Sequence, residues 1–148
     1  MREIIYAMRF TGRTEPVGSA GNVLAAATTA PSSALTVTVG PEGLSGVLQP
    51  AAGGEATFES EVTFTSETGF QETGTIAFGA GHELRFSTVG SGHLAPSADP
   101  GRRHGAVAWR VDGGEGQFAG ATGLITSNFF VAEDLAVTDH HFGVLLLP

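Results

Sequence analysis

Glu72 stands where a carboxyl group is well placed to transfer protons. It lies in Phe70–Phe78, a segment in which Phe70, Ile76 and Phe78 share one face in the two-residue period of a β-strand, and Glu72 falls on that apolar face. A carboxyl group in such surroundings is partly desolvated, which raises its pKa and suits it to general acid or base catalysis near neutral pH. Two structural alternatives stay open: a local bulge that turns Glu72 to solvent, or an arginine that pairs with it.

Tyr6 is the second candidate catalytic residue. It is the only tyrosine of the chain, and it shares a face with Ile4, Met8 and Phe10. A buried phenol usually needs a hydrogen-bond partner. Tyr6 would therefore bind a substrate carbonyl or, alternatively, bond to a neighbour in the core.

Three further residues are candidates for substrate contact inside the fold. Trp109, the only tryptophan, alternates with Val107 and Val111 and would line a cavity or fill the core. Asn128 is a polar group in an apolar segment, and it would orient a ligand or tie down a neighbouring strand. Phe86 lies in another predicted strand and would add to the apolar lining.

His93 and His104 lie near the two ends of the longest irregular stretch, Gly90–Gly105. Loops of this length without structure of their own are usually functional or disordered. Its place between two strands predicts a loop at the rim of a barrel, able to act as a lid. Each histidine is a candidate proton carrier and substrate contact, or an ordinary solvated loop residue.

No pattern indicates a metal ion or an organic cofactor. Cysteine and lysine are absent, which excludes thiolate metal sites, cysteine nucleophiles and lysine Schiff bases. His140 and His141 are adjacent, so on a strand they point to opposite faces and cannot bind one metal ion together. Asp139 and His141 do share a face, but no third ligand is indicated. We therefore expect a site that works without metal or cofactor.

The net charge argues against nucleic acids and membranes as partners. The 148 residues include 15 acidic and 7 basic side chains, a formal net charge of −8, which repels phosphate backbones and anionic lipids. Met1–Phe10 lacks the apolar run of a signal peptide, and no stretch reaches the roughly 18 apolar residues of a spanning helix. We expect a cytoplasmic protein that binds a small apolar molecule or another protein.

Short segments of alternating polarity predict a single all-β domain over residues 1–148. Clusters of Gly, Pro, Ser or Asp separate them, and none has a convincing helical stripe. The predicted strands are Glu3–Thr11, Val23–Thr29, Leu35–Val39, Thr57–Glu67, Phe70–Phe78, Glu83–Val89, Ala106–Val111, Leu124–Val131 and His140–Leu147. Without helical crossovers, such strands pair antiparallel in a barrel of about eight strands or in a sandwich.

The two terminal segments favour the barrel. Glu3–Thr11 carries apolar residues on both faces, and His140–Leu147 is apolar at nearly every position. Apolar residues on both faces predict that both faces are covered. In a closed barrel one face fills the interior, so the outer face must meet something else. We expect a homo-oligomer, a dimer or a trimer, with its interface around the terminal strands.

The segment Gly113–Gly123, GGEGQFAGATG, fits GGxGxFxxAxG at each fixed position. It resembles the turn before the last strands in the allene oxide cyclase and dirigent superfamily, whose members are eight-stranded antiparallel, calycin-like barrels. The glycines would permit positive φ at a tight corner, and Phe118 would plug one end of the core. The N-terminal motif around the catalytic glutamate of the plant cyclases is absent here, so the resemblance transfers no catalytic residue.

The resemblance implies a class of function. Members of this superfamily hold a reactive hydrophobic molecule in the barrel and direct its ring closure or coupling without a cofactor. Our first hypothesis is a cofactor-independent cyclase or isomerase for an apolar natural-product intermediate such as a polyketide. The second is a non-catalytic barrel that binds a small hydrophobic ligand, and the third is a protein-interaction module with a filled interior. A cavity of about 300 Å³ or more with convergent polar groups would support the first two, whereas a solid interior would exclude both.

Overall fold

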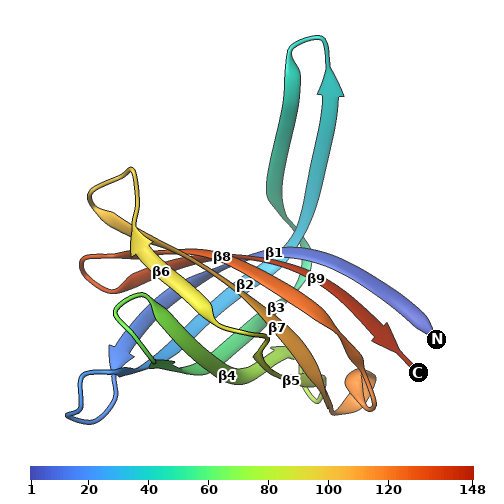
Figure 1. The fold of residues 1–148 in the computed structure, drawn as a ribbon. Helices are drawn as coiled ribbons and strands as arrows, with labels where there is room; N and C mark the ends of the chain where they lie inside the picture. Colours follow the sequence, from blue (N-terminus) through green and yellow to red (C-terminus); the bar gives the residue numbers. More distant parts are fainter.

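The computed structural model describes all 148 residues and contains nine β-strands, one short 3₁₀ turn and no α-helix (Figure 1). The strands are β1 (Arg2–Pro16), β2 (Val23–Gly40), β3 (Gly43–Phe64), β4 (Gly69–Phe78), β5 (Glu83–Thr88), β6 (Gly92–Pro96), β7 (Arg102–Gly114), β8 (Thr122–Ala132) and β9 (Ala136–Leu147). The 3₁₀ turn η1 spans Gly116–Phe118. The predicted all-β class is confirmed. No helix of the structure has the length and apolar character needed to cross a membrane.

Eight of the strands form a ring of antiparallel pairs. The order is β1, β2, β3, β4, β5, β7, β8 and β9, and β9 pairs back with β1. Strand β6 is additional, and it pairs with both β4 and β7. Arg2 lies opposite Leu147, so the two termini are neighbours (Figure 1). Each ring strand therefore presents one face to a shared interior.

Two sequence predictions about connections were wrong. Gly90–Gly105 is not an irregular loop, because β6 and the start of β7 pair within it, with Leu94 opposite Gly105 and Ala95 opposite His104. Gly92 and Pro96 stand at the two ends of β6. At a strand end, the missing side chain of glycine and the missing N–H of proline weaken the strand little. The predicted strands Val23–Thr29 and Leu35–Val39 are parts of one longer strand, β2.

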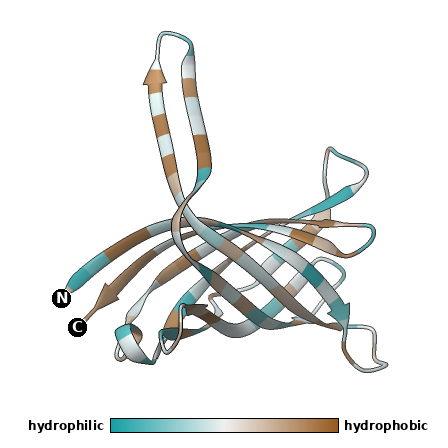
Figure 2. Ribbon diagram, turned by 180° about the vertical axis from the view of Figure 1, so that it is seen from behind, coloured by the Kyte–Doolittle hydropathy of each residue, from teal (hydrophilic) through white to brown (hydrophobic).

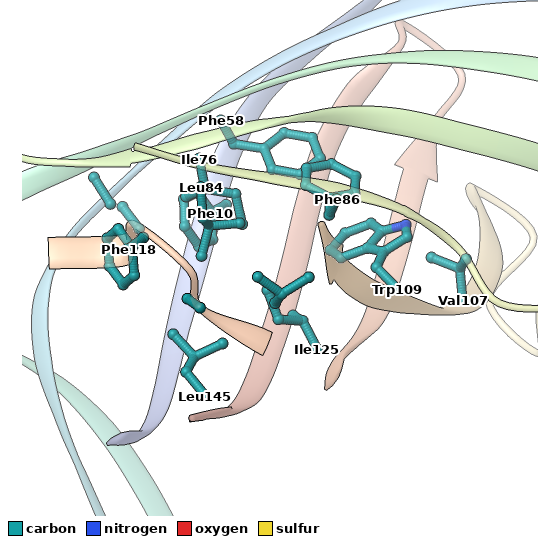
Figure 3. Packing of buried hydrophobic residues seen from close by; sticks show 14 of the residues in the cluster. Phe10, Phe58, Ile76, Leu84, Phe86, Val107, Trp109, Phe118, Ile125 and Leu145 are labelled. Atoms are coloured by element: carbon teal, nitrogen blue, oxygen red, sulfur yellow. The ribbon is translucent and has the colours of Figure 1, made fainter. Parts of the chain in front are cut away.

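Aromatic side chains fill the middle of the ring. The rings of Phe58 and Phe86 stack with centroids 5.3 Å apart, and Trp109 lies 4.4 Å from Phe86 (Figure 3). Gly74 on β4 makes room for this cluster, since a Cβ at that position would lie 2.8 Å from the Phe86 ring. A glycine facing inwards is thus part of the packing rather than a turn.

The glycine-rich segment closes one end of the ring. Gly113 and Gly116 have φ of 88° and 60°, values that favour glycine. Phe118 of η1 is buried and packs against Phe78, with ring centroids 5.4 Å apart. The predicted role of Phe118 as a plug at one end of the core is confirmed.

The far halves of β2 and β3 leave the ring as a hairpin arm, residues 33–50 (Figure 1). Strand β1 pairs with β2 only from Thr11 to Pro16, and the register of β2 with β3 shifts between Pro31 and Ser33. The edge of β1 that faces the arm therefore has no strand neighbour over Arg2–Phe10. The arm pairs only with itself, and bands of high and low hydropathy alternate along it (Figure 2).

Candidate functional site

Glu72 points into the ring, as its position on the apolar face of β4 predicted. Its side chain is buried and has no arginine partner. Ser60 of β3 donates a hydrogen bond to Oε1 at 2.6 Å, and the Trp109 indole N–H of β7 donates to Oε2 at 3.1 Å. Both alternatives left open by the sequence, a bulge to solvent and an arginine pair, are excluded.

Thr88 fixes the backbone of Glu72 at the point where the pairing of β4 with β5 ends. The Glu72 N–H donates to Thr88 Oγ1 at 2.8 Å, and the same hydroxyl donates to the Glu72 carbonyl oxygen at 2.9 Å. The last ladder pair joins Thr73 and Ser87. A side-chain hydroxyl thus replaces the missing ladder bonds and holds the orientation of Glu72.

Burial raises the pKa of the Glu72 carboxyl to about 8. The hydrogen bonds from Ser60 and Trp109 oppose this change, because they stabilise the charged form, and the negative charge of Asp139 adds to it. At neutral pH Glu72 is therefore mainly a neutral carboxylic acid. Such a group can donate a proton or a hydrogen bond inside an apolar site.

A second polar group enters the interior from β8 and β9. Asp139 accepts a hydrogen bond from Ser127 Oγ at 2.6 Å, and its other oxygen lies 2.8 Å from Nε2 of His141. All three side chains are buried. A carboxylate only accepts hydrogen bonds, so Nε2 of His141 carries the proton in this pair. Nδ1 of His141 is buried and has no partner.

Aromatic rings hold His141 in place. Its imidazole stacks on Phe10, with ring centroids 4.2 Å apart. Phe58 and Trp109 form T-shaped pairs with it, with ring centroids 5.3 and 5.0 Å away. Trp109 therefore connects Glu72 with the Asp139–His141 pair, because it donates a hydrogen bond to Glu72 and packs against His141. The two groups and the aromatic cluster form one assembly.

Glu72 and Asp139 line a single small internal cavity of about 50 Å³. The rest of its wall is apolar apart from Thr14 and Thr28, whose buried hydroxyls have no hydrogen-bond partner. Of the polar groups expected to converge on a cavity, only Glu72 is found here, because Tyr6 and Asn128 lie elsewhere. The cavity is also far smaller than the volume that would support ligand binding or catalysis, because the aromatic side chains fill most of the interior, as expected for the protein-interaction module.

Leu24 and Phe64 separate this cavity from the surface. Both side chains line the internal cavity, and both also line an open depression outside it beside Asn22, Glu67 and Arg103. Each is only partly buried. Rotation of these two side chains would join the cavity to the depression.

Tyr6 lies away from this cavity, near the end of the ring where the arm begins. Its ring covers Gly143 and meets Phe78 edge-on, with centroids 5.4 Å apart. The hydroxyl oxygen is buried and has no hydrogen-bond partner. Burial, and secondly the charge of Asp139, raises the pKa of Tyr6 above its ordinary value, so the phenol stays protonated.

The remaining sequence candidates divide between the interior and the outer surface. Trp109 and Phe86 lie in the aromatic cluster beside Glu72. His93, His104 and Asn128 are exposed on the outer face of the sheet. His104 stacks on Phe130 there, at 4.6 Å. The structure therefore does not bring these three residues to the interior cavity.

Sequence analysis missed several residues of the site. Asp139 and His141 were recognised as sharing a face, but only as possible metal ligands, and no group of three or more ligating side chains could hold a metal ion. Ser60, Ser127 and the two threonines had no signal beyond their place in alternating segments. Two polar residues at i and i+2 in an apolar terminal strand were the available clue.

Comparisons with protein-family models, with curated proteins and with solved structures found no match.

Proposed function

We propose that the ring of strands is a β-barrel and that the protein is a cofactor-independent cyclase or isomerase of an apolar carbonyl compound, such as a polyketide intermediate. One observation carries the proposal. A protonated Glu72 and the hydrogen-bonded Asp139 face the same apolar cavity. An acid and a base at one site permit proton transfer in both directions without a cofactor.

In the proposed reaction Glu72 acts as the acid and Asp139 as the base. Asp139 removes a proton from a carbon beside a substrate carbonyl, while Glu72 donates its proton to the carbonyl oxygen. The resulting enol attacks a second carbonyl of the same chain and closes the ring. The enol O–H returns its proton to the Glu72 carboxylate, and the protonated Asp139 donates its proton to the new alkoxide, so both groups regain their starting states. The reaction is redox-neutral and conserves the atoms of the substrate. Apolar walls would hold the flexible chain in its reactive fold, which supplies proximity and orientation.

His141 and Trp109 are positioning residues in this scheme. The imidazole N–H holds one oxygen of Asp139 at 2.8 Å, and the indole N–H holds one oxygen of Glu72 at 3.1 Å. Both rings are locked by the aromatic cluster. Each carboxyl group therefore keeps its orientation while a proton moves.

Entry of a substrate requires the aromatic filling to move. A cavity of about 50 Å³ lies well below the roughly 300 Å³ of ordinary ligand sites. The proposal therefore includes an open state in which Leu24 and Phe64 swing outwards and the interior merges with the outer depression. Phe64→Ala should speed ligand binding, because it removes the larger of the two side chains.

The test uses Trp109 as a reporter. Trp109 is the only tryptophan and donates a hydrogen bond to Glu72. Its fluorescence should therefore change when a ligand enters the cavity. Linear polyketones and related apolar carbonyl compounds would be screened for this change and for cyclised products by mass spectrometry. Glu72→Gln should lower kcat by about 100-fold or more, while Glu61→Gln, on the exposed face of β3, should leave it unchanged.

Each outcome has a defined meaning. Binding without conversion would contradict the enzymatic function and favour the alternative, a non-catalytic barrel that binds a small hydrophobic ligand. Equal turnover by Glu72→Gln and the unaltered protein would remove the assigned acid. Absence of both binding and conversion across the panel would overturn the proposal.

A further inference from the structure

The hairpin arm carries an uncovered apolar face. In the β2–β3 register Leu35 lies opposite Leu48, Val37 opposite Gly46 and Val39 opposite Leu44. Residues directly opposite one another in an antiparallel pair share a face. Val39 and Leu44 are 82% and 77% exposed. The other face carries Thr36, Thr38, Ser45 and Val47, so the arm is amphipathic in water (Figure 2).

The arm is held at a set angle to the ring. Ser33 donates a hydrogen bond to the carbonyl oxygen of Ala7 at 2.8 Å, which ties the base of the arm to the free edge of β1. Ser32 donates to the carbonyl oxygen of Gly54 at 2.6 Å across the hairpin. Gly53 has φ of 147°, and a Cβ there would lie 2.4 Å from Ser32 Oγ. The bulge after Pro31 is thus a fixed corner.

A second apolar surface lies beside the base of the arm. Ile5, Leu124 and Phe142 are 60%, 54% and 47% exposed on the outer faces of β1, β8 and β9. Ile5 and Phe142 line the same open groove as Leu35 of the arm. We call Ile5, Leu124 and Phe142 the wall. Arm and wall are therefore the two sides of one continuous apolar corner.

Charge distribution favours a second copy of this chain as the occupant of that corner. The chain carries a net charge of −8, yet the arm from Ser33 to Pro50 contains one ionisable residue, Glu42 at its tip. Residues 142–147, beside the wall on β9, contain none, while Glu55 lines the groove and Glu3 and Arg9 share the outer face of β1 with Ile5. Two acidic molecules can approach each other with least repulsion where both surfaces carry few charges.

The area of the two surfaces sets the symmetry. Each arm strand has eight residues outside the ring. The ribbon is about 26 Å long and about 10 Å wide, so one face offers roughly 260 Å². A single arm on a single wall would bury about 500 Å², too little for a stable complex. Two reciprocal contacts would bury about 1,000 Å², which reaches the minimum expected of a specific interface.

We propose that the protein is a two-fold symmetric dimer in which each arm lies with its apolar face on the wall of the other copy. The proposal also accounts for the arm itself. A two-stranded ribbon without a third layer is marginal in water, and the partner's wall supplies that layer. It is independent of the proposed enzymatic function, because neither surface includes Glu72 or Asp139.

The first experiment is a mass measurement by size-exclusion chromatography with light scattering at micromolar concentration. The unaltered protein should have twice the 15.1 kDa chain mass. Val37→Asp should reduce it to the mass of one chain, weakening dimerisation by about 100-fold or more, since each dimer would bury two unpaired carboxylates. Thr36→Asp, on the opposite face of the same arm, is the matched control and should stay dimeric.

The second experiment is a complementation between surfaces. Phe142→Lys alters the wall as Val37→Asp alters the arm, and each variant alone should be monomeric. An equimolar mixture should form a heterodimer, because one arm–wall contact is intact and the other pairs the introduced aspartate with the introduced lysine. Unchanged thermal unfolding and Trp109 fluorescence would show that both variants are folded, and Val39→Asp provides a second arm variant.

Several results would overturn the proposal. These are a single-chain mass for the unaltered protein, a mass of three chains, equal disruption by Thr36→Asp, and failure of the mixture to associate. An arm that packs on another arm would give the last of these results, because the wall variant would then remain dimeric by itself.

Discussion

The interior of the ring and the hairpin arm depart from ordinary residue placement in opposite directions. Inside, Glu72, Asp139 and His141 are titratable groups buried among aromatic rings. On the arm, Val39 and Leu44 are large apolar side chains exposed to water. A buried ionisable group is costly unless it is paired, and an exposed apolar face is costly unless it is covered. Each region thus holds a feature that the isolated chain leaves incompletely satisfied.

The comparison also separates two kinds of stability. Contacts in the interior are made within one chain, so a change there should alter the free energy of unfolding. The apolar face of the arm has no contact partner within the chain beyond its base. Changes on that face should alter association and leave the stability of the single chain nearly constant.

The largest expected effect is the dependence of stability on pH at Glu72. Its pKa is about 4.5 in an unfolded chain and about 8 in the folded chain, so between these values the folded state binds more protons than the unfolded state. Stability conferred by this group is therefore complete below about pH 4.5 and is lost as pH rises through about 8. At about 1.4 kcal/mol per pH unit, the loss amounts to as much as about 5 kcal/mol.

Urea unfolding of the unaltered protein and of Glu72→Gln, from pH 5 to pH 9, would measure this loss as a difference between two curves. Asp139 and His141, the other titratable groups facing this interior, are present in both proteins. The unaltered protein should lose stability relative to the variant as pH rises. Parallel curves would show that Glu72 is ionised throughout, and Glu61→Gln should give such parallel curves.

The next effect sharpens the contrast between core and arm. Phe58 is buried and contacts Phe86, Trp109 and His141. Phe58→Ala should lower the free energy of unfolding by about 3–5 kcal/mol, because it removes a buried ring and leaves a cavity. Val39→Ala should change the free energy of unfolding by less than about 0.5 kcal/mol. Phe58→Ala and Val39→Ala are each introduced into Val37→Asp, so that both are measured as monomers. Similar losses in the two proteins would erase the distinction between the regions.

The smallest effect concerns the hydrogen bond from Ser60 to Glu72. This bond lowers the pKa of Glu72 against the effect of burial, so Ser60→Ala should raise that pKa above 8. One hydrogen bond to a charged group corresponds to a rise of about one pH unit. Trp109 fluorescence followed against pH would report the change. Ser87→Ala, at an exposed hydroxyl that bonds to Asp112, should leave the midpoint where it is.

Local patterns in the chain sufficed for some of these features. The two-residue period placed Phe70, Glu72 and Ile76 on one face, and all three are buried. The turn chemistry of Gly113–Gly123 predicted a corner closed by Phe118, as observed. These features depend on neighbours within a few residues, which the sequence states directly.

Other features depended on partners that are remote in the chain. The polar partners of Glu72 come from β3 and β7, at sequence distances of 12 and 37 residues. Asn128 lies on the outer face because its strand register sets the parity of the whole strand. The exposure of Leu35 and Val37 follows from where β2 leaves β1. No local pattern could reveal these choices.

The sequence by itself determined the all-β class, the inward direction of Glu72 and the closing turn, because alternation and glycine conformation act locally. Tertiary structure alone decided which strands are neighbours in the ring, that Asp139 and His141 meet Glu72 through one aromatic cluster, and that the arm stands free. The physical reason is register. Which strand faces which, and where pairing stops, is set by cooperative contacts across the sheet rather than by any single segment.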